Sequence, residues 1–164
     1  MKTTPVQSLL AITLAAEFEA LCTALNRFPA EVFSVAPTQG HSAAWHALHV
    51  MDWTRCVIQP GLEGVNPALT YGYLGFENEA WANAVTGPTL AQQQDDKDVI
   101  LMALQGVLLE ALEAVRTAPA GRFEADALWT TLKRPRPVLD GLTYHLRHTA
   151  YHRGQLAPLL KELT

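Results

Sequence analysis

Charged residues are scarce in this chain. Asp, Glu, Lys and Arg together make up only 17% of its 164 residues, and the net charge is −4 at pH 7. A surface that binds nucleic-acid phosphates needs a concentrated positive patch, so nucleic acid is not an expected partner. Because 49% of the residues are hydrophobic, an intrinsically disordered chain is excluded as well.

Cysteine is nearly absent. The two cysteines, Cys22 and Cys56, lie too far apart in the sequence for a CxxC site and are too few for a disulfide framework. Disulfide-poor chains are typical of reducing compartments, so we predict a cytoplasmic location.

No hydrophobic run approaches the ~18 consecutive apolar residues that a membrane-spanning helix needs. Residues 9–16 are apolar and near the start, as in a signal peptide, but Glu17 and Glu19 follow at once. Apolar positions at helical spacing then continue to Phe28, beyond any cleavage point. We therefore expect a first core helix and no membrane partner.

Helical periodicity accounts for most of the sequence. Long helices are expected at about 5–28, 41–58, 90–117 and 138–162, with a short helical piece near 76–85 and a further short piece around 123–132. Residues 59–75 are rich in Gly, Pro and Asn and predict a long loop, residues 133–137 (KRPRP) predict a stiff basic turn, and Pro158 predicts a kink. No segment shows convincing strand alternation. Four long helices with an extended connection after the second predict an all-α four-helix bundle.

The histidines fall into two clusters. His148 and His152 lie one turn apart on the same face of the last predicted helix, and His145 lies about 60° round from His148. His46 and His49 lie on the second helix and differ by a similar angle, so spacing does not decide which of the two faces the last helix. Neutral imidazole is a common metal ligand, and each cluster offers part of a transition-metal site.

A spaced pair of histidines is by itself more often an ordinary hydrogen-bonded pair in a core or on a surface. Two clusters on two helices favour a metal site, because bundles place site residues on facing inner surfaces. Other metal motifs are missing. Thr149 stands where the glutamate of HExxH would be, and the chain has no ExxH pair of the di-iron type.

Two short motifs resemble those of the DinB/YfiT superfamily. They are residues 45–50 (WHALHV) and residues 148–155 (HTAYHRGQ). Members of this family are antiparallel four-helix bundles with a long crossover after helix 2 and a three-histidine metal site. One ligand lies in a Trp-x-x-x-His motif on helix 2, and two lie in an HxxxH on the last helix, commonly followed by Gly-Gln. The resemblance implies His49, His148 and His152 as ligands, and residues 1–164 as a single DinB-like domain.

The resemblance also implies a function. Three imidazoles accept Zn²⁺ or Ni²⁺, which we expect first, and also Mn²⁺ or Fe²⁺. Relatives include thiol S-transferases, a mycothiol-dependent isomerase and presumed hydrolases. We therefore expect a metal-dependent enzyme, either a thiol S-transferase or a hydrolase, acting on a small electrophilic substrate, with a low-molecular-weight thiol as a further cofactor in the first case. Relatives are often dimers, which implies a homodimer.

Two alternatives stay open. One is a non-catalytic metal-binding or stress-response bundle protein, and the other is a bundle that has lost its metal and keeps its histidines for packing. Four residues are candidates for catalytic or pocket roles beside the ligands, with ordinary packing as the competing interpretation: His46, His145, Tyr144 and Tyr151. Asp52 is a further candidate for steering substrate or relaying a proton.

Overall fold

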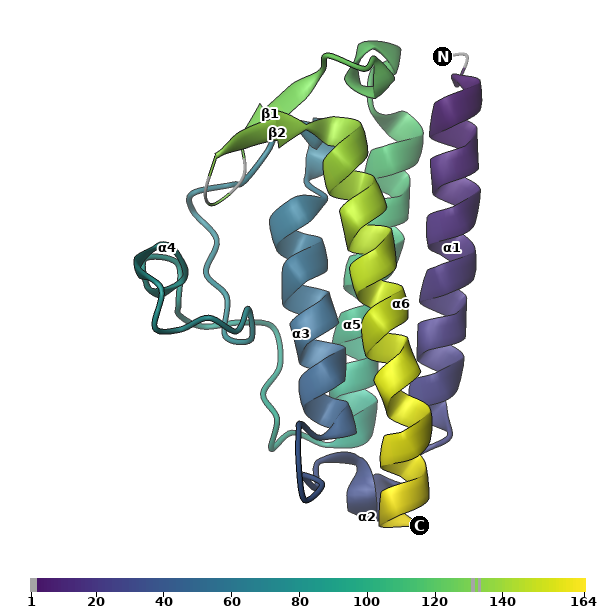
Figure 1. Ribbon diagram of the computed structural model, residues 1–164, viewed down its shortest axis with the longest axis vertical. Helices are drawn as coiled ribbons and strands as arrows, with labels where there is room; N and C mark the ends of the chain where they lie inside the picture. Colours follow the sequence, from purple (N-terminus) through teal and green to yellow (C-terminus); the bar gives the residue numbers. More distant parts are fainter. Residues whose placement is uncertain (1–2, 131, 133) are drawn as a thin grey trace.

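Most of the chain is helical in the computed structural model, which describes residues 3–130, 132 and 134–164 (Figure 1). Four long helices confirm the predicted all-α fold: α1 (Pro5–Asn26), α3 (Ala43–Val57), α5 (Lys97–Thr117) and α6 (Val138–Leu163). The shorter elements are α2 (Ala30–Phe33), η1 (Pro60–Leu62), α4 (Ala80–Asn83), η2 (Ala120–Phe123), β1 (Leu128–Thr130) and β2 (Pro135–Pro137). Lys133 of the predicted basic turn lies outside the described residues.

The four long helices pack around a shared core. Helix α1 contacts α5 and α6, and α3 contacts the same two helices. The crossover between α3 and α5 (residues 58–96) carries α4 and lies beside α3, on the side away from α1 (Figure 1). The crossover therefore borders the α3–α6 side of the bundle, where both histidine clusters are found.

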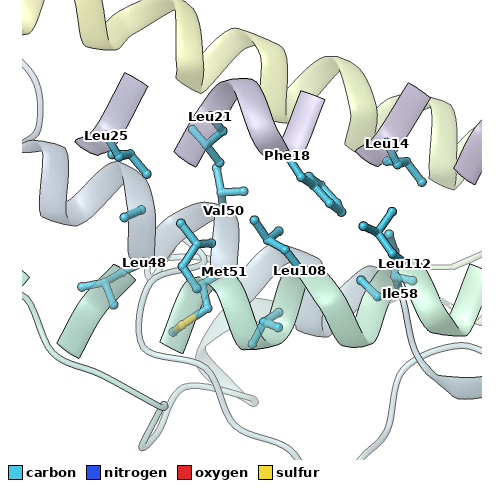
Figure 2. Close-up of a cluster of buried hydrophobic side chains, with 14 of the residues drawn as sticks. Leu14, Phe18, Leu21, Leu25, Leu48, Val50, Met51, Ile58, Leu108 and Leu112 are labelled. Atoms are coloured by element: carbon cyan, nitrogen blue, oxygen red, sulfur yellow. The ribbon is translucent and has the colours of Figure 1, made fainter. Parts of the chain in front are cut away.

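Helix α1 shows why these residues fold in this way. Thr4 accepts a hydrogen bond from the Gln7 amide and the Gln7 side chain accepts one from the Thr4 amide, which forms a capping box. The buried residues of α1 recur at helical spacing and point toward side chains of α3 and α5 (Figure 2). They include Leu14, Phe18, Leu21 and Leu25.

By length and composition alone, α1 is also apolar enough to cross a membrane. Counting consecutive apolar residues did not indicate this, because polar residues such as Thr13 and Glu17 interrupt the run. In the structure, one face of α1 is buried against α5 and α6, as the first core helix was expected to be.

Two local predictions need correction. Helix α5 begins at Lys97 rather than near residue 90, because the preceding residues form a turn in which the Gln92 amide donates to the Asp95 carboxylate at 2.7 Å. β2, within the predicted basic turn, is a strand that pairs antiparallel with β1. The short piece expected around 123–132 holds β1. Helix α6 continues through Pro158 to Leu163, in agreement with its predicted range.

The hairpin is fixed to α6 by a contact between an indole and a glycine. A Cβ atom at Gly141 would lie 2.0 Å from Cζ2 of the buried Trp129. We expect Gly141→Ala to lower the free energy of unfolding by about 1–3 kcal/mol, because the indole must move out of a packed position. Urea denaturation measures the change.

Gly106→Ala is the matched control for that measurement. Gly106 lies on the exposed face of α5, with no atom within 4 Å of an added Cβ. Alanine there should raise the free energy of unfolding by about 0.5–1 kcal/mol, because it favours the helix over the unfolded chain. If Gly141→Ala were as stable as Gly106→Ala, the Trp129 contact would not be holding the hairpin.

Candidate metal centre

Imidazoles from α3 and α6 meet between the two helices. The Nε2 atom of His148 lies 3.1 Å from Nε2 of His49 and 3.0 Å from Nε2 of His152. His49 and His152 are buried and His148 is half-buried. The structure thus brings together the three histidines predicted as ligands, and it selects His49 over His46 as the α3 member of the group.

The spacing of these nitrogens fits one transition-metal ion. A tetrahedral ion with bonds of 2.0–2.1 Å holds its nitrogen ligands about 3.3 Å apart. His49 Nδ1 lies 2.7 Å from the carbonyl oxygen of Tyr73, which can only accept, so this Nδ1 carries the proton. Its Nε2 therefore presents a lone pair toward the other two rings. A cation among the three nitrogens would satisfy such a donor set.

Asp52 places the Tyr73 carbonyl that orients His49. The fully buried Asp52 carboxylate accepts hydrogen bonds from the amides of Gly72 (2.8 Å) and Tyr73 (2.9 Å) through Oδ2. Its Oδ1 accepts from Arg55 at 2.9 Å and from the Thr89 hydroxyl. With both oxygens occupied, Asp52 ties the crossover to α3, which favours a positioning role over the predicted proton relay.

We expect Asp52→Asn to weaken metal binding by about 10–100-fold, as loss of a group that orients a metal ligand typically does. The asparagine NH₂ cannot accept a hydrogen bond, so either the two crossover amides or Arg55 and Thr89 lose their acceptor, and the crossover is held less firmly to α3. Competition with a chromophoric chelator measures the affinity. Asp140→Asn, at the exposed start of α6, is the control and should bind like the wild type. Equal affinities in the two variants would rule out the positioning role.

Burial keeps the clustered histidines uncharged. Burial, followed by the charge on neighbouring imidazoles, lowers the pKa of His49 to about 3 and that of His152 to about 2. Burial also lowers the pKa of His148 to about 4. At neutral pH all three therefore offer lone pairs, which metal coordination requires.

The other two clustered histidines have different surroundings. His46 Nδ1 lies 2.9 Å from Nδ1 of His152. His46 therefore contacts the ring nitrogen of His152 that does not face His148. Such a contact orients a ligand, as the Tyr73 carbonyl does for His49. His145 lies in the core, where its Nε2 donates to the Thr54 hydroxyl at 2.9 Å. This position favours packing as the role of His145.

A cavity of about 1080 Å³ lies against the three histidines. Tyr144 and Tyr151 line it and are exposed, as their predicted pocket roles require. The Tyr144 ring lies parallel to that of His148 at 6.1 Å, and the Tyr151 ring meets that of His152 edge-on at 5.2 Å. The remaining large aromatic side chains of the lining are Trp45, Trp53, Phe76, Trp81 and Trp129.

Sequence reasoning missed how the crossover orients His49. The Tyr73 carbonyl has no sequence signature, since any residue carries that group. Gly75 was missed too. Its φ of +70° favours glycine, and an added Cβ would lie 3.7 Å from Cε1 of His49. A glycine-rich stretch after a helix with candidate ligands was the available signal for a loop that returns to the site.

Comparison with known proteins gives one match. The family model described as the DinB superfamily matches residues 13–156. The matched segment contains all three clustered ligand candidates and most of every long helix. No curated protein and no solved structure matches the chain.

Proposed function

The chain belongs to the DinB superfamily, and on that basis we propose that it is a divalent-metal-dependent enzyme acting on a small electrophilic substrate. The observation that carries the proposal is the meeting of three uncharged imidazoles, those of His49, His148 and His152, at the wall of a large cavity. Three protein ligands leave a coordination position for a water, a thiol or a substrate, which distinguishes catalytic from structural sites.

These three histidines would hold the ion, with Zn²⁺ or Ni²⁺ expected first and Mn²⁺ or Fe²⁺ also accepted. When bound, such an ion lowers the pKa of a water or thiol and so supplies a nucleophile at neutral pH. The surrounding residues hold and enclose the site. Tyr73 and His46 orient two of the rings, and Trp45 stacks on His49 at 4.4 Å and keeps water from that side.

The size of the cavity is sufficient for a thiol S-transferase as well as for a hydrolase. Pockets for one drug-sized ligand measure about 300–1,000 Å³, so about 1080 Å³ has room for a low-molecular-weight thiol beside an electrophile. A hydrolase needs room for one substrate and a water. A non-catalytic metal-binding bundle has no use for a cavity of this size next to its ion.

The test has two stages. Elemental analysis of protein purified without a histidine tag should find about one divalent ion per chain. The loaded protein is then assayed with mycothiol, bacillithiol, glutathione or cysteine and monochlorobimane, and separately for hydrolysis of 4-nitrophenyl acetate. We expect thiol transfer that chelation abolishes. Bound metal without turnover of either kind would support the non-catalytic alternative, and absence of metal would support the bundle that keeps its histidines for packing.

A further inference from the structure

Arginines gather in the cavity although the chain as a whole is acidic. Among the described residues that line it, three are arginines (Arg134, Arg136 and Arg147) and one, Glu162, is acidic. The whole chain has 12 basic and 16 acidic residues. Basic residues therefore outnumber acidic ones in the cavity lining, whereas acidic residues are in excess over the whole chain. Glu162 accepts a hydrogen bond from the Thr38 amide at 2.8 Å and lies 15 residues beyond Arg147, about 22 Å along α6. The hairpin end of the cavity is therefore positively charged.

Two of these arginines are placed close to the histidine cluster. The guanidinium carbon of Arg136 lies 5.4 Å from the centre of the Tyr144 ring, and that of Arg147 lies 6.0 Å from the same centre. Tyr144 in turn stacks on His148. Tyr144 thus contacts both guanidinium groups and a proposed metal ligand, so an anion bound beside this ring would lie near the reaction centre.

A second part of the cavity lining, called the aromatic wall here, consists of Trp53, Phe76 and Trp81. Trp53 contacts Trp81 at 6.3 Å between ring centres, and Phe76 contacts Trp81 at 5.8 Å. Phe76 and Trp81 come from the crossover, whereas the arginines come from the hairpin and the first half of α6 (Figure 1). A ligand that complements both walls has a flat apolar body and an anionic group at one end.

We propose that the cavity selects amphiphilic anions, small molecules whose oxyanion is bound by Arg136 and Arg147 and whose apolar body lies on the aromatic wall. Guanidinium groups suit carboxylate, sulfonate and phosphate oxygens, because their planar N–H donors pair with two oxygens at once. The inference names a substrate class for the function proposed above. It makes a prediction about binding that does not depend on turnover.

Isothermal titration calorimetry with two probes of matched shape tests the proposal. Naphthalene-2-sulfonate carries the anion, and methyl 2-naphthyl sulfone is its neutral counterpart. We expect the protein as purified to bind the sulfonate at least 10-fold more tightly at low ionic strength, and the preference to shrink as salt is added. Sulfonate is a poor metal ligand, and a repeat with EDTA should keep the preference, which excludes coordination as its cause.

Arg136→Gln and Arg147→Gln should each weaken sulfonate binding by about 5–10-fold and leave sulfone binding unchanged. Arg116→Gln, at the exposed end of α5, is the control and should change neither. Equal binding of the two probes, no binding of either, or a preference that survives both cavity substitutions would overturn the proposal. If the protein prefers the sulfonate but shows no turnover, the proposed enzymatic function fails and this inference stands. If it shows turnover but no preference for the sulfonate, this inference fails and the proposed function stands.

Discussion

Replacing His152 by alanine should weaken divalent-metal binding by about 100-fold or more. Sites of this kind gain roughly 10 kcal/mol or more from their ion, and removal of one ligand in three costs on the order of 3 kcal/mol. Elemental analysis and chelator competition on untagged protein measure the effect.

His41→Ala is the matched control, since it removes a histidine that lines the same cavity without belonging to the cluster. His41 is exposed and stacks on Trp45 at 3.6 Å between ring centres. Its alanine variant should keep the affinity of the wild type. If His152→Ala bound metal as well as His41→Ala does, the three rings would not form the site, and the proposed function would fail with it.

Acid should unfold the metal-free protein well above the pH at which ordinary carboxylates titrate. Burial lowers the pKa of His46 to about 4 and that of His145 to about 3, and His49 and His152 are lowered in the same way. The unfolded chain takes up these protons below pH 6.5 and the folded chain does not, so stability is complete above pH 6.5 and falls as the pH drops toward 4. Each such histidine lowers the free energy of unfolding by about 1.4 kcal/mol for each pH unit of acidification in this range.

Together, these four buried histidines lower the free energy of unfolding by up to roughly 5 kcal/mol for each pH unit of acidification. This is a large share of the 5–15 kcal/mol that stabilises a typical domain. Urea unfolding at pH 8.5, 7.5, 6.5, 5.5 and 5.0, followed by circular dichroism in the presence of EDTA, measures the slope. Between pH 7.5 and 8.5 the histidines are neutral in both states, so this interval is the internal control and should show no loss attributable to them. Constant stability from pH 6.5 to 5.0 would show that these rings take up protons in the folded chain as readily as in the unfolded chain.

The four long helices were predictable because each buries one face, and buried faces repeat every three to four residues. In α1 this repeat runs from Leu14 to Leu25, and in α6 it places His148 and His152 one turn apart. The same periodicity put histidines on two helices, from which their meeting could be inferred. It did not decide between His46 and His49, because that choice depends on how α3 is rotated in the bundle.

Features that depend on contacts distant in the chain were not predictable. Strands β1 and β2 have three residues each, too few for a visible alternation, and the hairpin relies on Trp129 reaching Gly141 of α6. The start of α5 depends on a local turn at Asp95 that competes with the helical pattern. The Tyr73 carbonyl reaches His49 only because Asp52 holds the crossover in place, and nothing in the pattern of residues encodes that pairing.

The anchoring of the crossover has an evolutionary consequence. Asp52 holds Gly72 and Tyr73, and the chain beyond them leaves the bundle to form the α4 segment before it returns to α5 (Figure 1). Substitutions, insertions and deletions after this anchor change the aromatic wall while the helices that carry the histidines keep their packing. Lineages that share this bundle and its metal ligands should therefore diverge fastest around residues 76–86, and acquire new substrates there.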